Sequence, residues 1–322
     1  RQPGSDAQRR RGRTTLSACR SPTKGAISML NRKSLERSLA RYADHKDEAV
    51  RARLACFGPA LLRAADLKAA LPAAEPAWTD EEIEAAREGR LALLSTGAVT
   101  IDPAAYLEAA KAIAAELLSS LGAEGDFLAA CRAVDWTPFA SAELLADAAR
   151  APLVYLEKVE ALAGESDLLD IYILPTLGLA LRVFLDGAAD AASDRIAKTK
   201  SDTSHHNRPL RCPVCGAEAA VAAVVETPVN GNVKKLWCTC CGGHWLFERI
   251  RCAHCGDQAV SDLSYVHDEA DDAHRLHVCR ACGEAFPTVF AGDPLSFNAD
   301  VEQIVMTGLE MFYDTSVGGE KA

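Results

Sequence analysis

The sequence of 322 residues lacks the short motifs that mark the common catalytic folds. It has no glycine-rich phosphate loop, no nucleophile elbow and no Walker motif, which excludes the usual nucleotide-binding and hydrolase signatures. Aromatic residues are scarce, at 6%, whereas alanine is abundant, and this composition favours closely packed helices. Basic residues are also fewer than acidic ones, 35 against 45, so the formal net charge is −10. Such an acidic chain is not expected to bind nucleic acid, which requires a basic face to contact phosphate.

A complete export signal and an uninterrupted membrane span are both missing. Residues 1–28 are basic and polar, but no apolar core follows the arginines, so neither a Sec nor a twin-arginine signal is completed. The most apolar run, 168–185, contains Asp170, Pro175 and Arg182, which make a membrane span costly. We therefore predict a disordered leader, a buried core helix in the apolar run, and a cytoplasmic protein without membrane insertion. A groove for a partner is the alternative interpretation of that run.

Cysteine, by contrast, is abundant, and eight of the twelve cysteines form four Cys-x-x-Cys-Gly units. Two thiolates three positions apart on a tight turn can face one metal, and two such turns complete a tetrahedron. The glycine after each second cysteine suits a turn that needs a positive φ. In a chain of this size without an export signal, the pattern indicates metal binding in the reducing cytosol, not a disulfide framework. The units are Cys212-Pro-Val-Cys215-Gly216, Cys238-Thr-Cys-Cys241-Gly242, Cys252-Ala-His-Cys255-Gly256 and Cys279-Arg-Ala-Cys282-Gly283.

The spacing of the units shows an internal repeat. Between Cys215 and Cys238 lie 22 residues, between Cys255 and Cys279 lie 23, and between Cys241 and Cys252 lie only 10. Each repeat is therefore predicted as a ribbon in which hairpin strands join two cysteine turns. Crossed pairing between the repeats remains the alternative. The predicted metal ligands are Cys212, Cys215, Cys238 and Cys241 for one ion, and Cys252, Cys255, Cys279 and Cys282 for the other.

The rest of the chain is predicted to be helical. A capping box at Thr79-Asp-Glu-Glu82 and an Asp102-Pro103 pair mark two helix starts, whereas Gly58-Pro59 is expected to interrupt the first helical stretch. The polar chain from Gly187 to His206 is expected to form a linker. The predicted fold is a multi-domain α+β protein, in which an all-α N-terminal domain is followed by two tandem zinc-ribbon-like four-cysteine modules and a C-terminal helix. The predicted boundaries are 1–28 for the leader, 30–200 for the helical domain, 208–292 for the metal-binding domain (208–247 and 248–292 for its ribbons), and 296–314 for a helix packed on the helical domain.

A site with four cysteine ligands has no open coordination position, so Lewis-acid hydrolysis is not its role. Structure and one-electron redox chemistry remain, and a tetrahedron of sulfurs suits both zinc and iron. For a generic ribbon we favour structural zinc, whose binding contributes on the order of 10–16 kcal/mol to folding. No catalytic residue is predicted. The basic residues near the cysteine turns either offset thiolate charge, face an acidic partner or are ordinary solvated residues: Arg211, Lys234, Lys235, Arg249, Arg251 and Arg280.

The remaining cysteines and two histidines are not predicted ligands. Gly242 sets the register of the second turn and leaves Cys240 as a spare thiol, either inert or redox-active. The histidines His205-His206 are expected to lie in the linker. Packing roles are expected for Cys19, Cys56 and Cys131.

The order of these motifs resembles that of the formate dehydrogenase accessory protein (FdhE) family. A helical N-terminal part precedes Cys-Pro-Val-Cys-Gly, a Leu-Trp-Cys-x-x-Cys turn, Trp245 with Glu248-Arg-Ile-Arg-Cys-x-x-Cys-Gly, and a last Cys-x-x-Cys-Gly. The likeness is specific over about 210–290, weaker over 30–200 and 300–313, and absent from 1–28. Cys240, the basic leader and the glycine-containing tail after Asp314 depart from the pattern.

The resemblance implies a cytoplasmic accessory protein, without enzymatic turnover, that binds the catalytic subunit of respiratory formate dehydrogenase during maturation. It also implies rubredoxin-like modules that hold two iron ions per chain, with zinc as the alternative metal. The eight turn cysteines match the positions of the family's metal ligands. No nucleic-acid partner is expected, and a homodimer is left open. The alternative function is a zinc-ribbon adaptor for another complex, such as nucleic-acid machinery.

Overall fold

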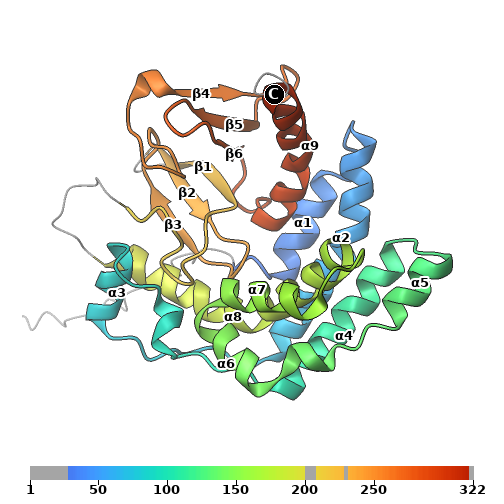
Figure 1. Cartoon of the computed structure of the whole chain (residues 1–322). Coiled ribbons are helices and arrows are strands. Elements are labelled where there is room, and N and C mark those ends of the chain that lie inside the picture. Colours follow the sequence, from blue (N-terminus) through green and yellow to red (C-terminus); the bar gives the residue numbers. More distant parts are fainter. Residues whose placement is uncertain (1–27, 200–207, 228–230, 319–322) are drawn as a thin grey trace, which may run out of the picture.

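The computed structural model describes residues 28–199, 208–227 and 231–318, which form a helical region and a β-sheet region (Figure 1). The predicted order of a helical N-terminal part, a four-cysteine β part and a C-terminal helix is confirmed. Residues 1–27 and 200–207, and with them Cys19, His205 and His206, lie outside the described residues. The helices are α1 (Arg32–Arg41), α2 (Glu48–Ala70), α3 (Asp80–Arg87), α4 (Pro103–Ser120), α5 (Gly125–Arg132), α6 (Ala142–Arg150), α7 (Pro152–Ala163), α8 (Leu174–Lys198) and α9 (Ala299–Gly318). Short helical turns are η1 (Leu93–Thr96), η2 (Thr137–Ala140), η3 (Leu169–Ile173) and η4 (Val260–Asp262).

Two helix starts follow directly from local sequence. The Thr79 hydroxyl accepts a hydrogen bond from the Glu82 N–H at 3.2 Å, and the Glu82 carboxylate accepts one from the Thr79 N–H at 2.8 Å. The Asp102 carboxylate accepts a hydrogen bond from the Ala105 N–H at 2.8 Å, just before Pro103 opens α4. These bonds satisfy N–H groups that have no partner within the helix. Both predicted helix starts are therefore confirmed.

The prediction that Gly58-Pro59 interrupts the first helical stretch is wrong, because α2 runs through both residues. Pro59 has no N–H to bond to the carbonyl four residues earlier, and this loss alone disfavours a helix interior. Burial of Leu61 and Ala64 on the following turn outweighs that loss. Gly58 in turn permits close packing of α1, since a Cβ there would lie 3.3 Å from Leu39 Cδ2.

The apolar run at 168–185 forms the beginning of the central helix. A π-helical turn, η3, leads into α8, which packs against α2, α3, α4 and α7 and runs as far as Lys198. The expectation that a linker starts after Gly187 is therefore wrong. The polar sequence stays helical because its inward-facing residues are small or apolar and buried. These residues include Ala188, Ala189, Ala192 and Ile196.

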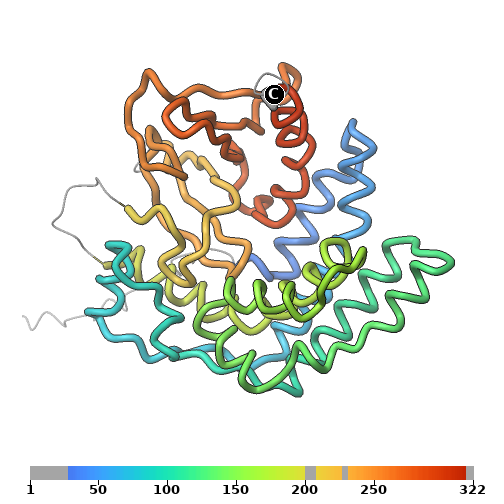
Figure 2. Tube along the Cα trace, viewed as in Figure 1, coloured from blue at the N-terminus to red at the C-terminus, as the bar shows by residue number. Residues whose placement is uncertain are grey.

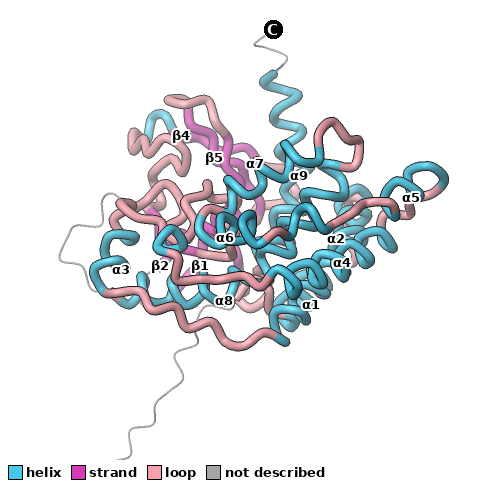
Figure 3. The backbone as a smooth tube through the Cα atoms, turned by 60° about the horizontal axis from the view of Figure 1, so that its bottom comes forward, coloured by secondary structure: helices cyan, strands magenta, loops and turns pink. Residues whose placement is uncertain are grey.

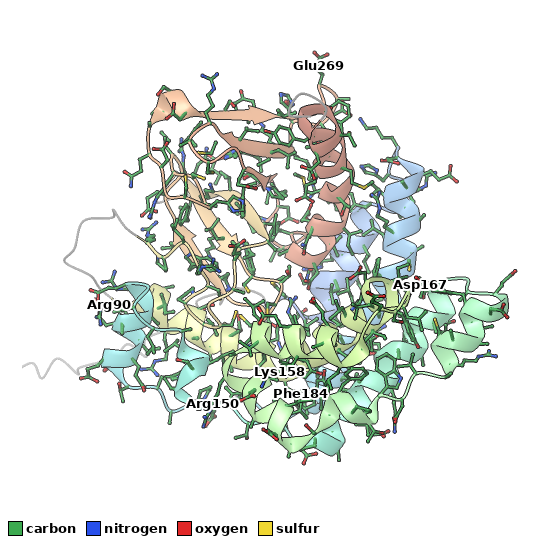
Figure 4. All side chains as sticks on the ribbon, in the orientation of Figure 1. Arg90, Arg150, Lys158, Asp167, Phe184 and Glu269 are labelled. Carbon is green, nitrogen blue, oxygen red and sulfur yellow. The ribbon has the colours of Figure 1, made fainter. Side chains whose placement is uncertain are left out.

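Among the described residues, one helix is long and apolar enough to cross a membrane, and it is this one, Leu169–Lys198. Its most apolar window is 61% buried within the protein. A helix packed at the centre of a helical layer can be this long and apolar without crossing a membrane. Figure 3 shows helices of this layer, such as α6 and α8, in front of β1 and β2. Phe184 of α8 and Lys158 of α7 lie within the same layer in Figure 4.

The two predicted ribbons share one six-stranded sheet with the order β3-β2-β1-β6-β5-β4. In the first ribbon, β2 pairs antiparallel with both β1 and β3, and in the second, β5 pairs antiparallel with both β4 and β6. The ribbons join where β1 and β6 run parallel, with Ala222 opposite Thr288 and Val225 opposite Ala291. The strands are β1 (Val221–Thr227), β2 (Gly231–Trp237), β3 (His244–Phe247), β4 (Leu263–Val266), β5 (His274–Cys279) and β6 (Ala285–Ala291).

The two ends of this sheet have different neighbours. The edge strand β3 packs against α8, whereas the opposite edge strand β4 lies at the far side of the sheet from the helical layer (Figure 1). Helix α9 returns beside α1 and α2, and it also covers one face of the sheet through β1, β5 and β6 (Figure 2). A separate small core forms under α9, where the Trp237 ring lies 5.4 Å from the Phe297 ring.

Candidate metal centres

The four Cys-x-x-Cys-Gly units fold into four matching turns, which we call knuckles 1 to 4 in chain order (212–216, 238–242, 252–256 and 279–283). In each knuckle the glycine N–H donates to the carbonyl of the first cysteine, with N···O distances of 2.8, 2.9, 3.2 and 2.8 Å. The N–H of the first cysteine donates to the carbonyl of the residue after the glycine, at 2.7, 2.9, 2.8 and 2.9 Å. All four glycines have φ between 79° and 89°, a conformation that a Cβ disfavours. Local sequence therefore accounts for the shape of each knuckle.

The knuckles meet in two pairs, and each pair gathers four sulfurs that all lie within 4.8 Å of one another. Knuckles 1 and 2 form the first group, which we call site 1, and knuckles 3 and 4 form the second, site 2. The structure thus groups the cysteines within each repeat and does not cross the repeats. Site 1 contains Cys212, Cys215, Cys238 and Cys241, and site 2 contains Cys252, Cys255, Cys279 and Cys282.

The sulfur geometry fits a tetrahedral metal ion. In site 1 the Sγ–Sγ distances are 3.6 Å for Cys212–Cys241 and 3.5 Å for Cys215–Cys238. The corresponding distances in site 2, Cys252–Cys282 and Cys255–Cys279, are both 3.7 Å. A metal about 2.3 Å from four sulfurs needs tetrahedron edges of about 3.8 Å, whereas a disulfide needs about 2.05 Å. Each donor set can therefore hold one thiophilic ion, such as zinc or iron, with no coordination position left over.

Site 1 lies between the sheet and the helical layer, and all four of its cysteines are buried. The N–H groups of Leu93 and Leu94 in η1 donate to two carbonyls of knuckle 1, at 3.0 and 2.9 Å. Just beyond knuckle 2, the His244 N–H donates to the Ser193 hydroxyl of α8 at 2.9 Å. The site 1 cysteines belong to the same hydrophobic core as the helices. The helical region therefore encloses site 1.

A buried ion network ties α8 to knuckle 2 and to α9. Arg182 is 2% exposed, and it donates to the Thr239 carbonyl within knuckle 2 at 2.7 Å and to both carboxylate oxygens of Asp300 at 2.6 and 2.9 Å. Asp186 lies 3.6 Å from the Arg182 Nε and 2.6 Å from the Lys68 Nζ. Burial opposes the charge on Arg182, but the charges of Asp300 and Asp186 outweigh burial and raise its pKa. A permanent cation therefore stands beside the site 1 thiolates.

The sequence pattern did not predict this network, although it shows Arg182 as a charge within an apolar run. The available signal was the pair Arg182 and Asp186, opposite charges four residues apart on a helix that is otherwise apolar at that point. Gly242 of knuckle 2 packs directly on this pair, and a Cβ at Gly242 would collide with the Asp186 Oδ1.

Site 2 lies on the open side of the sheet. Cys252 and Cys279 are buried, but Cys255 and Cys282 are exposed to solvent. Its knuckles are held by the sheet region itself. The Arg251 guanidinium donates to the Gly256 carbonyl at 3.3 Å, and the Arg280 N–H donates to a carbonyl of η4 at 2.8 Å. Within the described ranges, no hydrogen bond joins knuckle 3 or 4 to the helical region.

The basic residues near the knuckles divide into two groups. Lys234 and Arg251 are buried and approach the Phe247 ring, at 5.4 and 5.1 Å from its centroid. Burial lowers the pKa of Lys234 to about 8, against the opposing charges of Cys252 and Glu248. These two cations are placed to offset thiolate charge at site 2. Lys235 is half-buried, whereas Arg211, Arg249 and Arg280 are exposed.

Three cysteines outside the two sites lie in the described part of the chain, and they contribute to packing. Cys240 is half-buried against the main core and belongs to neither four-sulfur group. Cys131 is buried and Cys56 half-buried, and burial raises the pKa of both thiols.

The second ribbon contacts the helices at the opposite end of β5 from knuckle 4. The His274 Nε2 lies 3.0 Å from a carboxylate oxygen of Glu302 on α9. The hydroxyl of Tyr42, the residue that follows α1, donates to the same oxygen at 2.6 Å. The His274 Nδ1 lies 2.8 Å from Asp271, and Arg41 lies 3.5 Å from Glu302. We call these five residues the β5 clamp. Sequence reasoning did not find it, because its members are spread over some 260 residues of the chain.

The fold and the two sites define a class of protein: a helical region that supports a sheet with two four-cysteine groups, each of which could hold a metal ion. No protein-family model matches the chain. Curated relatives named "Protein FdhE homolog" do match parts of it. The relative from Pseudomonas aeruginosa is 30% identical over 132 residues, covering 38% of this chain and 40% of the relative. The relative from Aquifex aeolicus is 26% identical over 102 residues, covering 31% and 36%. The relative from Stutzerimonas stutzeri is 24% identical over 148 residues, covering 44% and 46%.

A solved structure has the same fold over nearly the whole chain. It is the crystal structure of the FdhE protein from Pseudomonas aeruginosa, with a TM-score of 0.51 and 18% identity, and the match covers 91% of this chain and 93% of that one. The sequence matches themselves span less than half the length of each curated relative. The chain is therefore similar to FdhE proteins in part of its sequence and in its fold.

Proposed function

We propose that this protein is a cytoplasmic accessory factor for the maturation of formate dehydrogenase, and that it binds the catalytic subunit of that enzyme. The observation that carries the proposal is the pair of four-thiolate groups on a helical support, in a chain related to FdhE proteins. The protein acts by binding, without turnover of its own, because a metal with four protein thiolates has no position for a substrate. The eight cysteines of sites 1 and 2 are the proposed metal ligands.

We further propose that each site holds one iron ion, with zinc as the alternative. A tetrahedral set of four thiolates suits both metals. Iron would let a site change charge by one unit on oxidation, and this change would alter the field at the surface of the second ribbon. The exposed Cys255 and Cys282 place site 2 where a bound partner could sense that change.

The test is affinity capture of the tagged full-length chain from anaerobically grown cells, with mass spectrometry of the bound proteins and metal analysis of the same eluate. The expected result is the catalytic subunit of formate dehydrogenase together with about two irons per chain, one per four-cysteine site. Two zincs with the same partner would retain the function and overturn the iron assignment. Transcription or ribosome components without a dehydrogenase would overturn the function and favour the adaptor alternative.

A matched pair of variants sharpens this test. The double variant Cys279→Ser/Cys282→Ser removes two proposed ligands of site 2, whereas Arg249→Ala changes an exposed residue near knuckle 3 that ligates nothing. The double variant is expected to lose one metal and to capture less partner, and the arginine variant to behave as the unaltered chain. Full metal content in the double variant would contradict the ligand assignment.

A further inference from the structure

The two four-thiolate sites are matched in sequence and in knuckle geometry but not in their access to solvent. All four site 1 cysteines are buried, whereas two of the four site 2 cysteines reach the surface. The relative exposures in site 1 are 2% for Cys212, 7% for Cys215 and 0% for Cys238 and Cys241. An external ligand can therefore approach a metal at site 2 along the Cys255 and Cys282 side, and it meets no such opening at site 1.

We propose that site 2 exchanges its metal with a thiolate ligand supplied by another molecule, through displacement of Cys255 or Cys282, while site 1 retains its metal. This inference rests on the proposed binding of a metal at both sites, and it adds that the two sites differ in whether they exchange the metal. The class of incoming ligand is a thiol, either small or on a protein, because a soft sulfur donor suits a thiophilic metal.

The exchange step is a ligand substitution without electron transfer. An incoming thiol would lose its proton and bond to the metal as a thiolate. The bond from the metal to Cys255 or Cys282 would break, and the displaced thiolate would take up the released proton. The oxidation state of the metal does not change. Repetition of the step at the remaining cysteines passes the metal to the incoming ligand.

The two sites also differ in what must open before a second ligand can enter. At site 1, entry requires separation of η1 from knuckle 1 and of Arg182 from the Thr239 carbonyl, bonds that lie between the helices and the sheet. Such opening exposes part of the main core and is therefore rare. At site 2, Cys255 and Cys282 already face solvent, so no helix has to move. Site 2 should thus exchange faster under identical conditions.

The experiment uses the full-length chain loaded with two equivalents of zinc, which is challenged with glutathione and a chromophoric zinc chelator. One equivalent is expected to appear in a phase about tenfold or more faster than the other. Pulsed alkylation with iodoacetamide, read by mass spectrometry, assigns the phases. Cys255 and Cys282 should be modified first, then Cys252 and Cys279, and the site 1 cysteines last. Release of both equivalents at one rate, or earlier modification of site 1, would overturn the proposal.

A variant confirms the assignment independently. In Cys255→Ser/Cys282→Ser the fast phase should disappear and the slow equivalent should persist at its original rate. If this variant fails to fold, the alkylation order in the unaltered chain still decides. A chain that takes up no zinc at all would defeat both this inference and the proposed metal binding. Two bound zincs that leave together would defeat the inference alone.

Discussion

The two ribbons of the sheet repeat one sequence pattern, yet the protein surrounds them differently. Both have knuckles with the same backbone hydrogen bonds, and each site has two sulfur pairs 3.5 to 3.7 Å apart. Site 1 is enclosed by η1, by α8 and by a buried arginine, whereas site 2 is held by the sheet region and opens to solvent. The comparison teaches that a cysteine motif specifies a metal-binding shape but not how accessible the metal is.

The position of each ribbon in the sheet explains the difference. Parallel pairing of β1 with β6 places the ribbons side by side, so only one of them can present its outer strand to α8. That strand is β3, which directly follows knuckle 2. The second ribbon instead contacts the helices through the β5 clamp, away from its knuckles, and Glu269 marks the far end of this ribbon in Figure 4.

The largest difference in stability is expected between a variant that loses one cysteine of site 1 and a variant that loses one cysteine of site 2. Cys238→Ser places a hydroxyl among buried sulfurs and removes one of the four proposed ligands of site 1. For structural zinc, metal binding is worth on the order of 10–16 kcal/mol, comparable with the whole stability of a domain. We expect little soluble protein from this variant. Cys282→Ser should leave the helical region folded, because site 2 is not part of the main core. Circular dichroism melting and metal analysis measure both, and equal stability of the two variants would contradict the comparison.

Removal of the buried cation tests the link between α8 and site 1. Arg182→Gln leaves Asp300 buried without its ion partner and leaves Asp186 with Lys68 as its ion partner. Breaking a buried ion pair in this way costs about 3–5 kcal/mol. The matched control Arg249→Gln changes an exposed arginine and should stay within about 0.5 kcal/mol of the unaltered chain. Urea unfolding of both variants gives the difference. A loss below about 1 kcal/mol in Arg182→Gln would show that the network does not support the interface.

Two glycine variants separate knuckle geometry from packing on the helices. Gly216→Ala and Gly242→Ala both put a Cβ at a positive φ, of 82° and 89°, which costs about 1–2 kcal/mol. Only the Gly242 variant also collides with Asp186, since a Cβ at Gly216 would be an acceptable 3.6 Å from Ala92 Cβ. We expect Gly242→Ala to lose a further ~1–3 kcal/mol in the same unfolding experiment. Equal losses would mean that knuckle 2 can move away from α8.

The β5 clamp predicts a weak pH dependence specific to the second ribbon. Burial alone would lower the pKa of His274, but the hydrogen bond to Glu302 and the charges of Glu302 and Asp271 outweigh burial and raise the pKa. The folded protein therefore holds this proton more tightly than the unfolded chain. The resulting stability is complete below the ordinary histidine pKa of about 6.5, and it is lost as the pH rises through the raised folded value.

A single proton limits the size of this effect to a slope of about 1.4 kcal/mol per pH unit. Unfolding free energies measured at several pH values above 6 should fall for the unaltered chain. In His274→Gln the unfolding free energy should fall less steeply with pH, because the contribution of the His274 imidazole is absent. If the unfolding free energy of the variant changes with pH at the same rate, the β5 clamp does not cause the pH dependence.

The sequence predicted those structural features that are set by residues close together in the chain. The knuckles, the capping box at Thr79 and the helix start at Asp102 were predictable, because each is fixed by residues within a few positions of one another. The continuity of α2 through Pro59 was not, since packing against distant residues overcomes a local preference there. Arg182 and Asp300 could not be paired from the sequence, because 118 positions separate them.

The sequence by itself determined that the chain has four Cys-x-x-Cys-Gly turns, two repeats and a helical support, since spacing, glycine positions and helix caps are short-range properties. Tertiary structure alone decided that the ribbons merge into one sheet, that a buried arginine stands beside site 1, and that site 2 stays open. The physical reason is that burial and charge pairing depend on which surfaces meet. In this protein those surfaces come from segments far apart in the sequence: the end of α1 meets β5 and α9, and α8 meets β3.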